Sequence, residues 1–150
     1  MTAVLIDTNV LVYAHDPGER ARQAQAIKVL DGLHSAGSAS LSVQSLAEFF
    51  VAVTRGVNPR MGPADAAAQV ERLAAAWPVL ALTPAILLEA GRGVVQRGLS
   101  YWDAQLWATA RLNQIPAIFS EDFASGSTLE GVRFVNPFAA GFSLAPWLSA

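Results

Sequence analysis

Short apolar runs alternate along the chain with longer stretches in which apolar residues recur every three or four positions. The short runs fit buried strands, and the longer periodicity is typical of helices that bury one face. The predicted strands are Ala3–Ile6, Ala39–Ser42, Val79–Leu82, Ala117–Phe119 and Val132–Val135. The predicted helices are Thr8–Ala14, Gly18–Ser35, Val43–Arg55, Ala64–Trp77, Pro84–Arg97 and Trp102–Asn113.

Strands that alternate with helices indicate an α/β fold, with a mostly parallel sheet and helices on both faces. No internal repeat or linker divides the chain, and 150 residues suit one domain. We therefore expect a single domain over residues 1–150. Residues 137–150 are interrupted by glycine and proline but remain apolar, so this tail is expected to pack on the domain or at an interface.

Composition narrows the classes of protein to consider. The chain is 53% hydrophobic and 15% charged, which excludes intrinsic disorder. No apolar run approaches the about 18 residues of a membrane span, and Asp7 precedes any basic residue, unlike a signal peptide. The absence of cysteine excludes a disulfide scaffold, a thiolate metal site and a thiol nucleophile. These features predict a cytoplasmic protein without a membrane partner.

Net charge argues against nucleic-acid binding through bulk electrostatics. The chain has ten basic and twelve acidic residues, which gives a formal charge of −2, and Lys28 is the only lysine. Nucleic-acid-binding modules usually carry a basic patch. A polyanion held by local arginines or metal ions stays possible.

Four carboxylates stand in apolar surroundings: Asp7, Glu48, Asp103 and Asp122. Asp7 directly follows a predicted strand, and Asp122 follows another by way of Ser120. Residues after parallel strands meet at the edge of the sheet where such folds bind ligands. Clustered carboxylates without a counter-charge favour protonation, unless a divalent cation lies among them. Oxygen-only ligands favour Mg²⁺ or Mn²⁺.

Each of these acids also has a simpler interpretation. Asp7, Asp103 and Asp122 all lie near predicted helix starts, where aspartate commonly caps the helix. Glu48 cannot be a cap, but it shares a helix stripe with Gln44 and fits a solvated polar face. The combination of strand ends and helix starts favours a shared site, while each residue alone fits the simpler role.

Five segments in order resemble the PIN domain, and within it the VapC-type toxins of bacterial toxin–antitoxin pairs. They are Ile6–Ala14, Ser42–Phe50, Ser100–Ala104, Ser120–Phe123 and Val132–Phe138. The resemblance covers nearly the whole chain. It implies a three-layer α/β/α sandwich around a central, mostly parallel sheet.

Carried over by position, the acidic quartet of the family falls on Asp7, Glu48, Asp103 and Asp122. Asn9 and Ser120 fall where members hydrogen-bond to the acids or to metal-bound water, although threonine is also frequent at the second position. The resemblance implies an endoribonuclease that depends on Mg²⁺ or Mn²⁺ and cleaves RNA with metal-activated water. It also implies a homodimer inhibited by a VapB-type antitoxin.

Other side chains near the quartet have less specific interpretations. Tyr13 and Trp102 fit core aromatics better than residues that stack on RNA bases. Arg20, Arg55 and Arg60 are candidates for holding the RNA backbone.

Rival enzyme classes fail on particular residues. A haloacid-dehalogenase-type phosphatase needs a second aspartate where Asn9 stands, and a late lysine that the chain lacks. A serine hydrolase needs a histidine base, but neither His15 nor His34 accompanies a nucleophile-elbow pattern. The alternative from another class is a non-catalytic PIN fold that only binds RNA or a protein.

Overall fold

The computed structural model describes residues 2–149, in which six strands form one sheet in the order β3-β2-β1-β4-β6-β5. The strands are β1 Val4–Ile6, β2 Ala39–Ser42, β3 Val79–Leu80, β4 Ala117–Phe119, β5 Thr128–Leu129 and β6 Val132–Val135. Every pair is parallel except β5 and β6. The prediction of a mostly parallel sheet is therefore confirmed.

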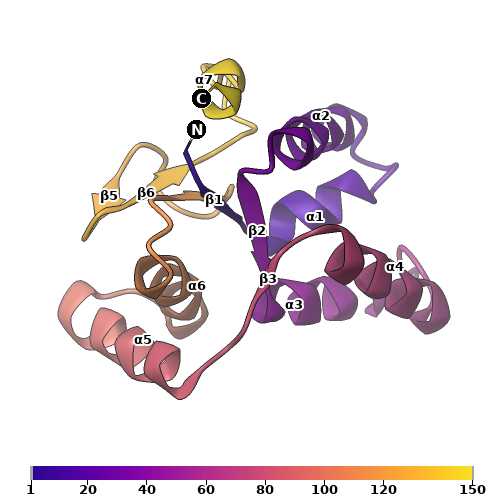
Figure 1. Ribbon diagram of the computed structural model, residues 1–150. Coiled ribbons are helices and arrows are strands. Elements are labelled where there is room, and N and C mark those ends of the chain that lie inside the picture. The colour runs from indigo at the N-terminus through magenta and orange to yellow at the C-terminus, as the bar shows by residue number, and fades with distance from the viewer. Residues whose placement is uncertain (1, 150) are drawn as a thin grey trace.

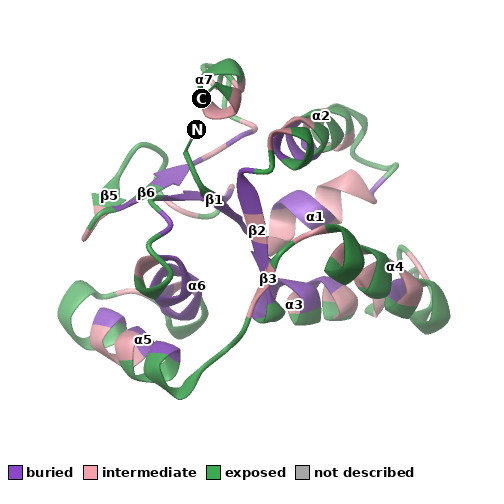
Figure 2. Ribbon diagram, viewed as in Figure 1, coloured by how far each residue is buried: buried purple, intermediate pink, exposed green. Residues whose placement is uncertain are grey.

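Helices cover both faces of the sheet, as the strand–helix alternation predicted (Figure 1). They are α1 Thr8–Ala14, α2 Arg20–Ala36, α3 Val43–Thr54, α4 Pro63–Ala76, α5 Pro84–Arg97, α6 Tyr101–Leu112 and α7 Ala145–Leu148. Alternate residues of β1 enter different cores: Val4 and Ile6 pack with α1 to α4, and Leu5 packs with α5 and α6. The result is a three-layer α/β/α sandwich whose strands are mostly buried (Figure 2).

Several local features differ from the sequence-based expectation. β3 was expected to reach Leu82 but ends at Leu80. The chain leaves the sheet there and leads to Thr83, which caps α5. β5 was not predicted, since its two residues carry no apolar run. It forms because Glu130 and Gly131 adopt positive φ angles of 47° and 85°, which turn the chain back onto β6. The prediction of a helix start at Asp122 is wrong, because the chain bends there without forming a helix.

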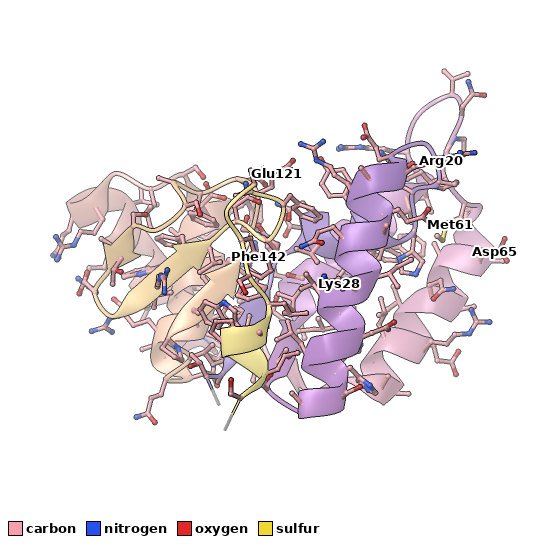
Figure 3. The ribbon with its side chains drawn as sticks, turned by 90° about the horizontal axis from the view of Figure 1, so that it is seen from above. Arg20, Lys28, Met61, Asp65, Glu121 and Phe142 are labelled. Atoms are coloured by element: carbon pink, nitrogen blue, oxygen red, sulfur yellow. The ribbon has the colours of Figure 1, made fainter. Side chains whose placement is uncertain are left out.

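The apolar tail packs along α2 and β4. Phe142 and Trp147 contact the ring of Phe119 edge-on, with centroid distances of 5.5 and 4.9 Å. A Cβ on Gly32 of α2 would lie 2.9 Å from Cδ2 of Leu144. Because glycine has no side chain, Leu144 can pack closely against α2. Figure 3 shows Phe142 beside α2, which carries Arg20 and Lys28. Among the described residues, no helix has the length and apolarity needed to cross a membrane.

The contact between α5 and α6 also depends on a glycine. A Cβ on Gly93 would lie 2.8 Å from Cζ3 of Trp107, a fully buried ring. Two residues away on the same helix, Gly91 has no atom within 4 Å of the corresponding position. The two helices can therefore pack closely only because position 93 lacks a side chain.

Gly93→Ala is expected to lower the free energy of unfolding by about 1–3 kcal/mol, because the methyl group would overpack against Trp107. Gly91→Ala is the matched control and should be neutral or stabilising by up to about 1 kcal/mol, since alanine is the better helix former. Urea denaturation of the three proteins measures both values. Equal effects of the two substitutions would contradict this account of the packing.

Candidate active site

The pairing of β1 with β4 brings together residues 113 positions apart in the sequence. Ile6 pairs with Phe119, so Asp7 and Ser120 leave the sheet side by side. The backbone N–H of Asp7 donates to the Phe119 carbonyl at 3.0 Å, and the Ser120 hydroxyl donates to Asp7 Oδ2 at 2.6 Å. Strand order also reverses here, which is where open α/β sheets form a ligand crevice.

Asp7 is both a helix cap and part of a cavity wall. Its Oδ1 accepts the Thr8 backbone N–H at 2.7 Å, so the capping interpretation is confirmed for this residue. The same side chain lines a cavity of about 690 Å³. A cap alone does not require the carboxylate to be buried, and Asp7 is only 7% exposed.

All four predicted acids line this one cavity. Asp7 follows β1, Glu48 lies in the middle of α3, Asp103 lies in the first turn of α6, and Asp122 follows β4. Asp103 does not cap its helix, since the N-cap is Ser100. Glu48 is half-buried and faces the cavity, rather than lying on a fully solvated face.

Hydrogen bonds hold most of these carboxylates in place. The Thr8 hydroxyl donates to Glu48 Oε1 at 3.0 Å, a contact that sequence reasoning missed. Asn9 Nδ2 donates to Asp122 Oδ2 at 3.1 Å, and the backbone N–H of Asp122 donates to the Ser120 hydroxyl at 3.1 Å. Asn9 and Ser120 thus contact members of the quartet.

The four carboxylates share a cavity without forming a tight cluster. Within residues 2–149, no three histidine, aspartate or glutamate side chains lie close enough to hold one metal ion. Glu48 and Asp122 instead direct one oxygen each to Thr8 and Asn9. All four acids therefore line one cavity, but their carboxylate oxygens do not meet at one point.

Burial raises the pKa of the Asp7 carboxyl from 3.8 to about 6. The hydrogen bonds from Ser120 and from the Thr8 backbone N–H oppose this shift, because they favour the ionised carboxylate. The negative charges of Asp122 and Glu48 raise the pKa further. A carboxyl that keeps its proton up to this pH lacks a compensating positive charge.

A buried pair of amides joins the two helices that carry Glu48 and Asp103. Gln44 Nε2 donates to the Trp102 carbonyl at 3.0 Å, and Gln105 Nε2 donates to Gln44 Oε1 at 3.0 Å. Both side chains are buried, so each needs these partners. Two glutamines beside the apolar residues of these helices were the sequence signal that could have indicated this contact.

The aromatic and arginine candidates differ in whether they line the cavity. Trp102 lines the cavity and is 62% exposed, so its interpretation as a core aromatic is wrong. Tyr13 is half-buried and donates its hydroxyl to Glu121 at 2.7 Å. Arg55 and Arg60 line the cavity, whereas Arg20 does not.

Asp7→Asn should make stability less dependent on pH. Because the pKa of Asp7 is higher in the folded chain than its ordinary value, the unfolded chain binds fewer protons between about pH 4 and 6. The free energy of unfolding of the parent protein therefore falls by roughly 2–3 kcal/mol as pH rises through that window. Asparagine still caps α1 but cannot ionise. The free energy of unfolding of Asp7→Asn, measured relative to that of the parent, should therefore rise by the same amount between pH 4 and 7.5.

Chemical denaturation in the presence of EDTA at several pH values measures this difference. Asp31→Asn, at an exposed position of α2, is the control. A difference between Asp7→Asn and the parent that stays constant with pH would contradict the assignment of the raised pKa to this carboxyl.

Comparisons with known proteins identify the family and the fold. The family model of the PIN domain matches residues 4–124. No curated protein matches the chain in sequence.

Among solved structures, the chain is similar to VapC20 of Mycobacterium tuberculosis, a toxin that cleaves the sarcin–ricin loop. That match has 24% identity and a TM-score of 0.65, and it covers 85% of this chain and 98% of that one. A toxin–antitoxin complex from Klebsiella pneumoniae matches at 18% identity and TM-score 0.65, covering 90% and 98%. VapBC2 of Rickettsia felis, bound to promoter DNA, matches at 12% identity and TM-score 0.63, covering 89% and 97%. With the family model spanning most of the chain, this protein belongs to the PIN domain family.

Proposed function

We propose that the protein is an endoribonuclease that depends on Mg²⁺ or Mn²⁺ and serves as the toxin of a VapBC-type pair. The observation that carries the proposal is the convergence of Asp7, Glu48, Asp103 and Asp122 on one cavity at the carboxyl ends of β1 and β4. Family membership and the toxins among the structural neighbours support it.

The residues on the cavity fit a hard divalent cation. Its acidic lining supplies only oxygen ligands, without histidine or cysteine, which suits Mg²⁺ or Mn²⁺. The raised pKa of Asp7 indicates an uncompensated charge that a cation would stabilise. Asp7 and Asp103 are the proposed ligands, with Glu48 and Asp122 completing the set. The hydrogen bonds from Thr8 and Asn9 engage one oxygen each of Glu48 and Asp122, so the second oxygen of each carboxylate can face the ion.

The bound metal would supply an activated water and stabilise charge on the scissile phosphate. The chain's own residues prepare the site for that chemistry. The Ser120 hydroxyl fixes Asp7 Oδ2, and the Thr8 backbone N–H fixes Oδ1, so the carboxylate orientation is set before any ligand arrives. Asn9 does the same for Asp122. These contacts reduce the reorganisation that catalysis would need.

Partners follow from the family and the neighbours. VapBC2 of Rickettsia felis and the Klebsiella pneumoniae protein were solved in toxin–antitoxin assemblies, which supports a VapB-type antitoxin as partner. We also propose a homodimer and an RNA substrate. A non-catalytic binding domain is the second candidate, but it gives no reason for burying Asp7 among further carboxylates at an energetic cost.

The first test is cleavage of labelled RNA by the purified protein. We expect cleavage with Mn²⁺ or Mg²⁺, none with EDTA, and a loss of at least about a hundredfold in Asp7→Asn and Asp103→Asn. Asp31→Asn should cleave like the parent, and circular dichroism should show that all variants are folded. Cleavage that persists in EDTA or in Asp7→Asn would overturn the proposed mechanism.

The second test is thermal stability with and without metal. A ligand that binds only the folded chain at a concentration of about a hundred times its Kd stabilises it by about 2.7 kcal/mol. Mg²⁺ or Mn²⁺ should therefore raise the Tm of the parent and of Asp31→Asn, and should have little effect on Asp7→Asn. Sodium chloride at matched ionic strength separates this effect from screening. An unchanged Tm in the parent would count against a shared metal site.

A further inference from the structure

The cavity extends along one face of α3. Its lining includes Val43 and Gln44 at the start of the helix, Glu48 in the middle and Arg55 directly after its end. A helix rises about 1.5 Å per residue, so these positions span about 18 Å. The cavity is therefore a groove elongated along α3, with Glu48 between its two ends.

One end of the groove carries a fixed arginine. Arg60 lines the cavity, and its Nε donates to Asp16 Oδ2 at 2.9 Å. Asp16 is buried, and its other oxygen accepts the Gly18 N–H at 3.0 Å. Among the described residues, Arg60 makes no further hydrogen bond. Its Nη groups thus remain available to an anion.

The loop that presents Arg60 is anchored at its base. The backbone N–H of Met61 donates to the Val53 carbonyl at 3.0 Å, and the Met61 side chain packs against the core. Together with the bond to Asp16, these contacts hold Arg60 at the groove without any ligand. Prior positioning of a guanidinium reduces the entropy lost when it binds a phosphate.

The other end of the groove presents an exposed aromatic face. Trp102 is 62% exposed, and Tyr101 supports its ring edge-on at a centroid distance of 5.2 Å. The Gln44 side chain holds the Trp102 backbone from α3. A large, exposed and fixed indole is unusual unless it serves binding, and it suits stacking on a nucleobase.

We infer that Trp102 and Arg60 hold the RNA substrate at the two ends of the groove, Trp102 by stacking on a base and Arg60 through a phosphate. The inference rests on the proposed function and assigns two side chains outside the acidic quartet that position its substrate. Stacking on Trp102 needs a base whose face is free, as in loops and single strands but not inside a duplex. Arg55, at the same end of the groove as Arg60, adds a second positive charge.

The test measures binding of a short, labelled, unstructured RNA by fluorescence anisotropy, in an Asp7→Asn background that prevents cleavage and at a fixed low Mg²⁺ concentration. Arg60→Gln keeps a donor for Asp16 but removes the charge. It should weaken binding about five- to tenfold and reduce the slope of log K against log salt by about 0.7. Arg20→Ala, outside the groove, should leave both unchanged.

Trp102→Ala should weaken binding about tenfold, and Trp102→Phe should weaken it less. RNA should quench tryptophan fluorescence in the background protein but much less in Trp102→Phe. A duplex of the same sequence should bind more weakly than the single strand. Thermal melting of each variant confirms that it is folded.

The inference is overturned if Arg60→Gln or Trp102→Ala binds RNA as the background protein does, or if the duplex binds as tightly as the single strand. In those cases metal-dependent cleavage by the parent would leave the proposed nuclease function standing. Absence of both RNA binding and cleavage would overturn the proposed function as well.

Discussion

The backbone pairing of β1 with β4 is the constraint on which the site depends. Because Ile6 and Phe119 lie in register, Asp7 and Ser120 emerge together at the point where strand order reverses. The hydrogen bond from Ser120 to Asp7 then fixes one carboxylate oxygen. Since side chains alternate between faces, a register slip of one residue would exchange the two cores and remove this contact. Fold and site are therefore specified by the same few backbone contacts.

Asp7 illustrates how a site can be stabilised locally and still carry an energetic cost. The carboxylate caps α1, where the helix dipole and the Thr8 N–H favour a negative charge. Burial and the neighbouring acids outweigh these contributions, as the raised pKa shows. A position that served only as a cap would lie at the surface, with no such penalty. A bound cation would offset this excess cost, which would couple stability to the proposed function at this residue.

Much of the fold and the acidic quartet could be predicted because both leave local signals. Short apolar runs marked the strands, and acids without neighbouring bases marked the site. Features that depend on contacts between distant segments were missed. The exposure of Trp102 follows from how α6 meets α3, and the burial of Asp16 follows from Arg60, 44 residues away. β5 forms through a turn at positive φ, and its sequence has no apolar alternation to indicate a strand.

The distribution of arginines explains how an acidic chain can present a positively charged end of a groove. On the opposite side of the sheet, Arg92, Arg97 and Arg111 form ion pairs with Glu89 and Glu130. These pairs join α5, α6 and the β5–β6 turn, and the two glutamates balance two of the three arginine charges. The net charge of −2 therefore describes the whole chain and not the groove. Where exposed charges are screened within about 10 Å, the field that a ligand meets depends on the few groups that line its binding site.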